Sequence, residues 1–128
     1  MGMIHVAATV RSSADPQRTW DGLFLVDTGA IDCLVPGKQL KEIGLVPRAQ
    51  RTYELADGSE VKMDITTAEI EFMGEIVGAT IIFGADDAEP ILGVTALKSA
   101  VIEVDPRNQK LKRLPAVRLK SLDVAVST

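Results

Sequence analysis

The chain has 128 residues, of which 46% are hydrophobic and 25% are charged, and its formal net charge at pH 7 is -4. This length and composition predict one folded domain around a single core, and they exclude a disordered chain. The acidic balance gives no global positive field that would gather nucleic acid, so nucleic-acid binding is not expected.

The first part of the chain predicts strands on either side of a loop that carries Asp27. Residues 3–11 are rich in Ile, Val and Thr and predict a strand, which the turn-forming residues 12–16 end. Residues 20–26 form a second apolar run and residues 31–35 a third. Asp27 therefore falls in a loop between two buried strands.

A short helix and a projecting hairpin are predicted next. Residues 38–43 place Leu and Ile at helical spacing, and Gly44 follows where a helix stop is expected. Residues 51–55 and 60–63 flank an Asp-Gly pair at 57–58. An Asp-Gly pair between two alternating segments is a strong signal for a β-hairpin.

Strands again dominate the second half of the chain. They are predicted at residues 65–72, 76–83, 100–104 and 109–114. Residues 91–93 form a very short apolar piece, residues 94–99 predict a second short helix, and residues 115–128 are interpreted as an appended tail. The pattern thus predicts an all-β fold with one or two short helices.

Asp27 is the best candidate for acid–base chemistry. The single histidine, His5, and the single cysteine, Cys33, exclude an internal disulfide and a cysteine-rich zinc site, and they leave no usual base for Ser or Cys catalysis. Chemistry must then come mainly from carboxylates, and Asp27 lies in a constrained loop beside Thr28 and Gly29. Asp-Thr-Gly alone also fits an Asx turn in which Asp27 merely caps its own backbone.

The surrounding sequence favours the catalytic interpretation. Residues 24–30, Phe-Leu-Val-Asp-Thr-Gly-Ala, resemble the active-site segment of retropepsin-like aspartic proteases. Residues 34–36 resemble the strand after the catalytic loop, and the hairpin at 57–58 resembles the flap that closes over substrate. Residues 91–93, Ile-Leu-Gly, resemble the hydrophobic-hydrophobic-Gly signature that packs beneath that loop. The resemblance spans about residues 4–114.

The resemblance implies a fold and an activity. The fold would be a single-lobe acid-protease (retropepsin-like) closed barrel over residues 1–114, followed by the tail at 115–128. The activity would be that of an aspartic endopeptidase, in which two carboxylates share one proton and activate a water molecule, without metal or cofactor. The chain contains one Asp-Thr-Gly, so Asp27 would have to meet Asp27 of a second copy in a homodimer.

The resemblance also implies roles for individual residues. Thr28 would hydrogen-bond across the two-fold axis, and Gly29 would donate its backbone N–H to the Asp27 carboxylate. A peptide or protein substrate would contact Ala30 and the flap residues Ala56, Asp57, Gly58 and Ser59.

Two positions depart from the viral members of the family. Those members typically place Asp directly after Asp-Thr-Gly-Ala and Arg directly after the hydrophobic-hydrophobic-Gly signature, and the two residues pair near the dimer contact. Here the positions hold Ile31 and Val94. We therefore expect an apolar dimer contact near Ile31. The same departure leaves open an alternative function, a non-catalytic peptide-binding or assembly module in which the dyad never forms.

The remaining candidates favour structural interpretations. The acidic residues Asp86, Asp87 and Glu89 are more typical of a solvated turn than of a cation site. Cys33 is predicted to be a packed thiol on a buried strand. No basic segment leads a long apolar run at the amino terminus and no later stretch approaches a membrane span, so a cytoplasmic protein without membrane partners is expected.

Overall fold

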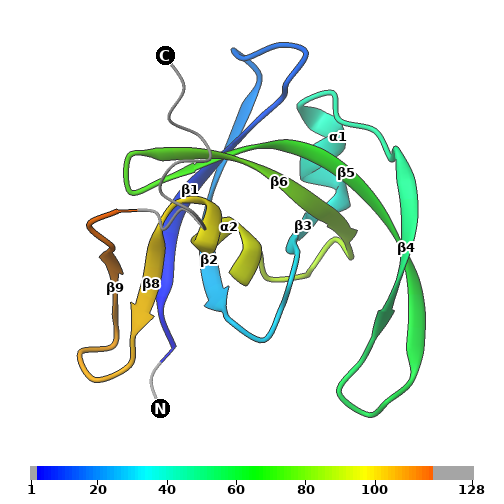
Figure 1. Cartoon of the computed structure of the whole chain (residues 1–128). Coiled ribbons are helices and arrows are strands. Elements are labelled where there is room, and N and C mark those ends of the chain that lie inside the picture. Colours follow the sequence, from blue (N-terminus) through cyan, green and yellow to red (C-terminus); the bar gives the residue numbers. More distant parts are fainter. Residues whose placement is uncertain (1–2, 117–128) are drawn as a thin grey trace, which may run out of the picture.

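Six strands close into a barrel, and a seventh extends one of them as a hairpin (Figure 1). The computed structural model describes residues 3–116. In chain order its elements are β1 (His5–Arg11), β2 (Thr19–Asp27), β3 (Cys33–Pro36), α1 (Gly37–Glu42), β4 (Ala49–Glu54), β5 (Glu60–Phe72), β6 (Glu75–Gly84), β7 (Ile91–Gly93), α2 (Val94–Ser99), β8 (Ile102–Asp105) and β9 (Lys110–Arg113). The predicted all-β closed barrel with one or two short helices is confirmed, and the described residues form two helices.

The sheet order explains how the barrel closes. The strands run β1-β2-β7-β3-β6-β5-β4, and β1 also pairs with β5, which completes the ring and leaves β4 outside it. Val10 of β1 faces Ile70 of β5 across this closing pair, and both side chains are fully buried. Closure leaves those six strands without free edges, and it fixes their positions relative to one another.

The predicted strands at 60–63 and 65–72 are one continuous strand, β5, so the predicted break between them is wrong. Asp64, the polar residue that interrupts the apolar pattern, instead accepts a hydrogen bond from the Gln50 side chain on β4 at 3.1 Å. The first part of this long strand pairs with β4, and its second part belongs to the barrel. We call β4, the turn at residues 55–59 and the first part of β5 the hairpin arm.

Several other boundaries differ by one or two residues from the sequence-based expectation, and two of them have a clear structural cause. The strand predicted at 31–35 begins only at Cys33, because the preceding residues belong to the loop after β2. The strand predicted at 100–104 begins at Ile102. Ala100 ends α2, and Val101 has a φ of 60°, a left-handed conformation that interrupts the extended chain.

The core lies inside the barrel and beneath its two helices. Its largest fully buried side chains include Phe24, Leu40, Ile70, Phe72, Ile81, Leu92 and Leu97. Phe24 on β2 and Leu92 on β7 belong to the two strands that lead to Asp27 and Gly93. Burying each such side chain contributes about 1.5–3 kcal/mol, so the end of β2 rests on a well-packed base.

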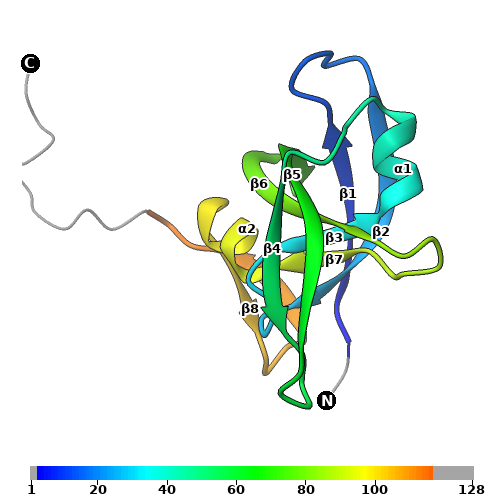
Figure 2. The same ribbon diagram turned by 90° about the vertical axis from the view of Figure 1, so that its right-hand side faces the viewer.

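A separate two-stranded sheet, β8–β9, lies against α2 (Figure 2). Arg113 of β9 joins it to the β5–β6 turn through an ion pair with Glu75 at 2.6 Å and a hydrogen bond to the Met73 carbonyl. Neither helix within residues 3–116 has the length and apolar character needed to span a membrane. Of the predicted tail, residues 117–128 lie outside the described part of the chain.

Candidate active site

Asp27 is the last residue of β2, beside Gly93 of the parallel strand β7. The Gly29 N–H donates a hydrogen bond to Asp27 Oδ1 at 2.9 Å, which is the contact that the family resemblance implies. The Ala30 N–H donates to the Asp27 carbonyl at 3.1 Å. Asp27 is half-buried and Thr28 is exposed. The loop thus turns tightly on itself and orients one carboxylate at its start.

We call residues 27–32 the Asp27 loop. This loop packs closely against β7 and is hydrogen-bonded to the start of α2. The Val94 N–H donates to the Ala30 carbonyl at 2.7 Å, and the Thr95 N–H donates to the Ile31 carbonyl at 3.3 Å. Gly93 lies so close to the loop that a Cβ atom there would be 2.5 Å from the Asp32 carbonyl oxygen. Gly93 has an ordinary φ of -83°, so close approach, rather than backbone conformation, requires glycine at this position.

The hairpin arm carries the other predicted site residues. Its turn is closed by Asp57, whose Oδ1 accepts hydrogen bonds from the Ser59 hydroxyl at 2.6 Å and the Ser59 N–H at 2.9 Å. Both bonds lower the pKa of Asp57 below its ordinary value, and the bond from the hydroxyl has the larger effect. Gly58 supplies the positive φ, 86°, that the turn needs. The predicted hairpin is therefore confirmed, and Asp57 is occupied in building it.

The hairpin arm and the Asp27 loop lie at the same end of the molecule. Figure 1 and Figure 2 both show the tip between β4 and β5 and the connection between β2 and β3 at this end. Within residues 3–116, no hydrogen bond joins the tip residues 56–59 to residues 27–30. The structure thus brings Asp27, Thr28, Gly29 and Ala30 together in one loop and places the tip residues in a separate element.

Asp32 is a site residue that the sequence analysis missed. Its Oδ2 accepts hydrogen bonds from Arg51 Nη1 at 2.7 Å and from the Tyr53 hydroxyl at 2.6 Å, and its side chain is only 7% exposed. Two sequence signals point to Asp32. One is a carboxylate within an apolar segment, and the other is a cation and a hydroxyl two residues apart on one face of a strand.

The contact with Asp32 helps to raise the pKa of both Tyr53 and Arg51. Burial, followed by the hydrogen bond to Asp32, raises the pKa of Tyr53 to about 12. The hydrogen bond to the Asp32 carboxylate likewise raises the pKa of Arg51 above its ordinary value. The phenol is therefore a hydrogen-bond donor over the whole range in which an enzyme would be assayed.

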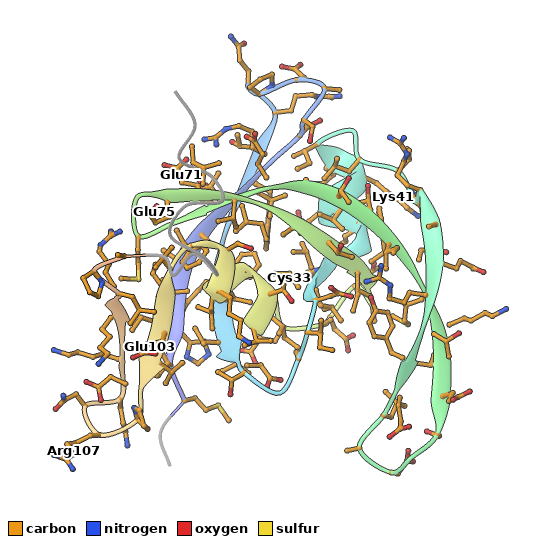
Figure 3. All side chains as sticks on the ribbon, in the orientation of Figure 1. Cys33, Lys41, Glu71, Glu75, Glu103 and Arg107 are labelled. Atoms are coloured by element: carbon orange, nitrogen blue, oxygen red, sulfur yellow. The ribbon has the colours of Figure 1, made fainter. Side chains whose placement is uncertain are left out.

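A cavity of about 270 Å³ opens between the Asp27 loop, α2 and the β5–β6 pair. Its wall is formed by Ile31, Asp32, Cys33, Thr67, Gly78, Ala79, Thr80, Thr95 and Ala96. Figure 3 shows Cys33 where β3 passes beside α2. Cys33 is 1% exposed, and burial raises the pKa of its thiol to about 11, so the prediction of a packed thiol is confirmed.

The acidic segment before β7 makes one side-chain hydrogen bond to β1. Glu89 Oε2 lies 3.0 Å from His5 Nε2 of β1, while Asp86 and Asp87 are exposed. The described residues hold no group of three or more His, Cys, Asp or Glu side chains placed to bind a metal ion together.

Comparison with known proteins shows a likeness to a solved structure. No family model matches the chain, and no curated protein matches it. Among solved structures, the chain is similar to the solution structure of the Simian Foamy Virus (mac) protease, with a TM-score of 0.53 and 16% sequence identity. The likeness covers 74% of this chain and 92% of that one. At this identity it shows the fold alone: the chain has the single-lobe, retropepsin-like barrel that its sequence predicts.

Proposed function

We propose that the chain is an aspartic endopeptidase that acts as a homodimer. The observation that carries the proposal is the geometry of the Asp27 loop, in which a half-buried carboxylate at the end of β2 is oriented by the Gly29 N–H. The loop rests on Gly93 and is hydrogen-bonded to the start of α2. This rigid support is what a catalytic carboxylate needs in order to hold a productive position.

The proposed chemistry needs two such carboxylates. Two carboxylates held close together cannot both carry charge cheaply, so the pair would retain one proton. The charged Asp27 would take a proton from the attacking water, while the protonated Asp27 of the second copy would polarise the peptide carbonyl. Proton transfer to the leaving amine would then break the peptide bond. Activity should peak on the acid side of neutrality, because full ionisation of the pair removes the acid and full protonation removes the base.

The dimer is proposed because each chain supplies one Asp-Thr-Gly. Ile31, which follows Ala30 within the Asp27 loop, is 67% exposed, so its apolar side chain is available for such a contact. A second copy related by a two-fold axis would cover Ile31 with its own equivalent surface. Thr28, also exposed, would lie near the same axis.

The function is tested by hydrolysis of a denatured protein substrate at a series of enzyme concentrations. We expect cleavage, inhibition by a statine-type transition-state analogue, and a specific activity that falls on dilution through the dimer dissociation constant. A binding module would show neither cleavage nor inhibition. Specific activity that stays constant down to a demonstrably monomeric state would exclude a shared site.

The proposed dimer contact gives a second prediction. Ile31→Asp should weaken self-association at least ~100-fold, because it loses about 1.5 kcal/mol or more of apolar burial in each chain and places a carboxylate in the contact twice. Sedimentation equilibrium measures this. Ile76→Asp is the matched control, since Ile76 is 56% exposed on β6 and should leave association unchanged.

A double variant sharpens that measurement. The Val94 N–H bonds the Ala30 carbonyl and the Thr95 N–H bonds the Ile31 carbonyl, so positions 31 and 94 are neighbours. Ile31→Asp combined with Val94→Arg should recover part of the lost association by forming an ion pair. If Ile31→Asp alone leaves the association constant unchanged, the proposed contact has been misplaced.

A further inference from the structure

We propose that Asp32 is a positioning residue that fastens the hairpin arm to the Asp27 loop and so holds the arm over the substrate site. The link itself is a structural feature, whereas its effect on substrate rests on the proposed function. Asp32 ends the Asp27 loop, and its partners Arg51 and Tyr53 both lie on β4. The contact therefore joins the element that orients Asp27 to the element that would cover the substrate.

The geometry makes this link specific. Both donors reach the same carboxylate oxygen, at 2.7 Å from Arg51 and 2.6 Å from Tyr53, which are the short distances of charge-assisted hydrogen bonds. The acceptor side chain is 7% exposed, whereas that of Arg51 is 48% exposed. A carboxylate so little exposed needs its donors, because an unpaired charge there would be costly.

The hairpin arm has few other contacts that fix its position relative to the barrel. β4 pairs with β5 alone, and it is not part of the closed ring. Within residues 3–116, the two bonds to Asp32 are the side-chain hydrogen bonds that tie β4 to any element other than β5. An isolated two-stranded hairpin is only marginally stable in water, so an arm without this link would move more freely.

The test compares Asp32→Asn and Tyr53→Phe with Asp64→Asn. Asp64→Asn is a matched control, because Asp64 also bonds a β4 side chain, Gln50, but does so from β5. If the link positions the arm, Asp32→Asn and Tyr53→Phe should each raise KM about tenfold, as expected from the loss of a hydrogen bond to a charged group, while kcat changes less than about threefold. Asp64→Asn should leave both constants near wild type.

Two further measurements do not depend on activity. Amide hydrogen exchange in β4 should become faster in Asp32→Asn and Tyr53→Phe, while exchange in the barrel strands β1 and β2 stays unchanged, which also shows that the variants fold. Tyr53 is the only tyrosine of the chain, so ultraviolet absorbance of the phenolate reports on it alone. Its pKa should fall below about 12 in Asp32→Asn, because the hydrogen bond to the carboxylate is removed while burial remains.

The outcomes separate this inference from the proposed function. If no hydrolysis that depends on Asp27 is found, the proposed function fails, while exchange and the phenol titration still decide whether Asp32 holds the arm. If hydrolysis is found but Asp32→Asn matches Asp64→Asn in KM and in β4 exchange, the inference is overturned. An equal increase in exchange throughout the barrel would also overturn it, because Asp32 would then serve general stability.

Discussion

Asp27→Asn should abolish peptide hydrolysis and leave the fold intact. Asparagine has the size of aspartate and retains an oxygen that can accept the 2.9 Å hydrogen bond from the Gly29 N–H, so the loop keeps its shape. What is lost is the carboxylate that the proposed mechanism uses as acid and base, and we expect kcat to fall by about 10³-fold or more. The measurement is steady-state cleavage of a denatured protein, with circular dichroism to verify folding.

The control for this variant is Asp87→Asn. Asp87 is exposed in the segment between β6 and β7, so its substitution changes the net charge equally and should leave the rate unchanged. Cleavage by Asp27→Asn at a rate near wild type would show that the proposed mechanism is wrong and would point to a contaminating protease.

Mixing the variant with the wild-type chain adds a test of the shared site. An excess of Asp27→Asn should draw wild-type chains into mixed dimers that contain one carboxylate and are inactive, so activity should fall as the variant is added. If the site were complete within one chain, the added variant would leave the wild-type rate unchanged.

The succession of strands along the chain and the loop at Asp27 could be predicted because their signals are local. Alternating apolar residues, an Asp-Gly turn and glycine at a helix end each act over a few positions. The same local rules failed at Asp64, where a polar residue suggested a break in what is one strand. There the register with β4 and the bond to Gln50 outweigh the local pattern.

Asp32 could not be found in the same way, because its partners are 19 and 21 positions away along the chain. Only the pairing of β4 with β5, of β5 with β6 and of β6 with β3 places Arg51 and Tyr53 beside the start of β3. The insertion of the three-residue strand β7 between β2 and β3 is equally non-local. The family resemblance, rather than periodicity, predicted that residues 91–93 lie beneath the Asp27 loop.

Gly93→Ala should strongly destabilise the protein. The new Cβ would lie 2.5 Å from the Asp32 carbonyl oxygen and 2.7 Å from both the Asp32 carbonyl carbon and the Ile31 carbonyl oxygen. These are backbone atoms, which cannot rotate away as the end of a flexible side chain could. Relief requires the Asp27 loop to move from β7, which would strain the 2.7 Å bond from the Val94 N–H to the Ala30 carbonyl. We expect a loss of about 3 kcal/mol in the free energy of unfolding.

Gly78→Ala provides the matched comparison for that loss. Gly78 also lies in a strand, β6, but an added Cβ there would meet no atom within 4 Å. It should leave stability unchanged or raise it by up to about 1 kcal/mol, because alanine restricts the unfolded chain. Urea unfolding of both variants and the wild type at one protein concentration measures the difference, since dimerisation would make stability concentration-dependent. Equal urea midpoints for Gly93→Ala and Gly78→Ala would show that the Asp27 loop can move without loss of stability. They would also show that β7 does not hold the carboxylate in place.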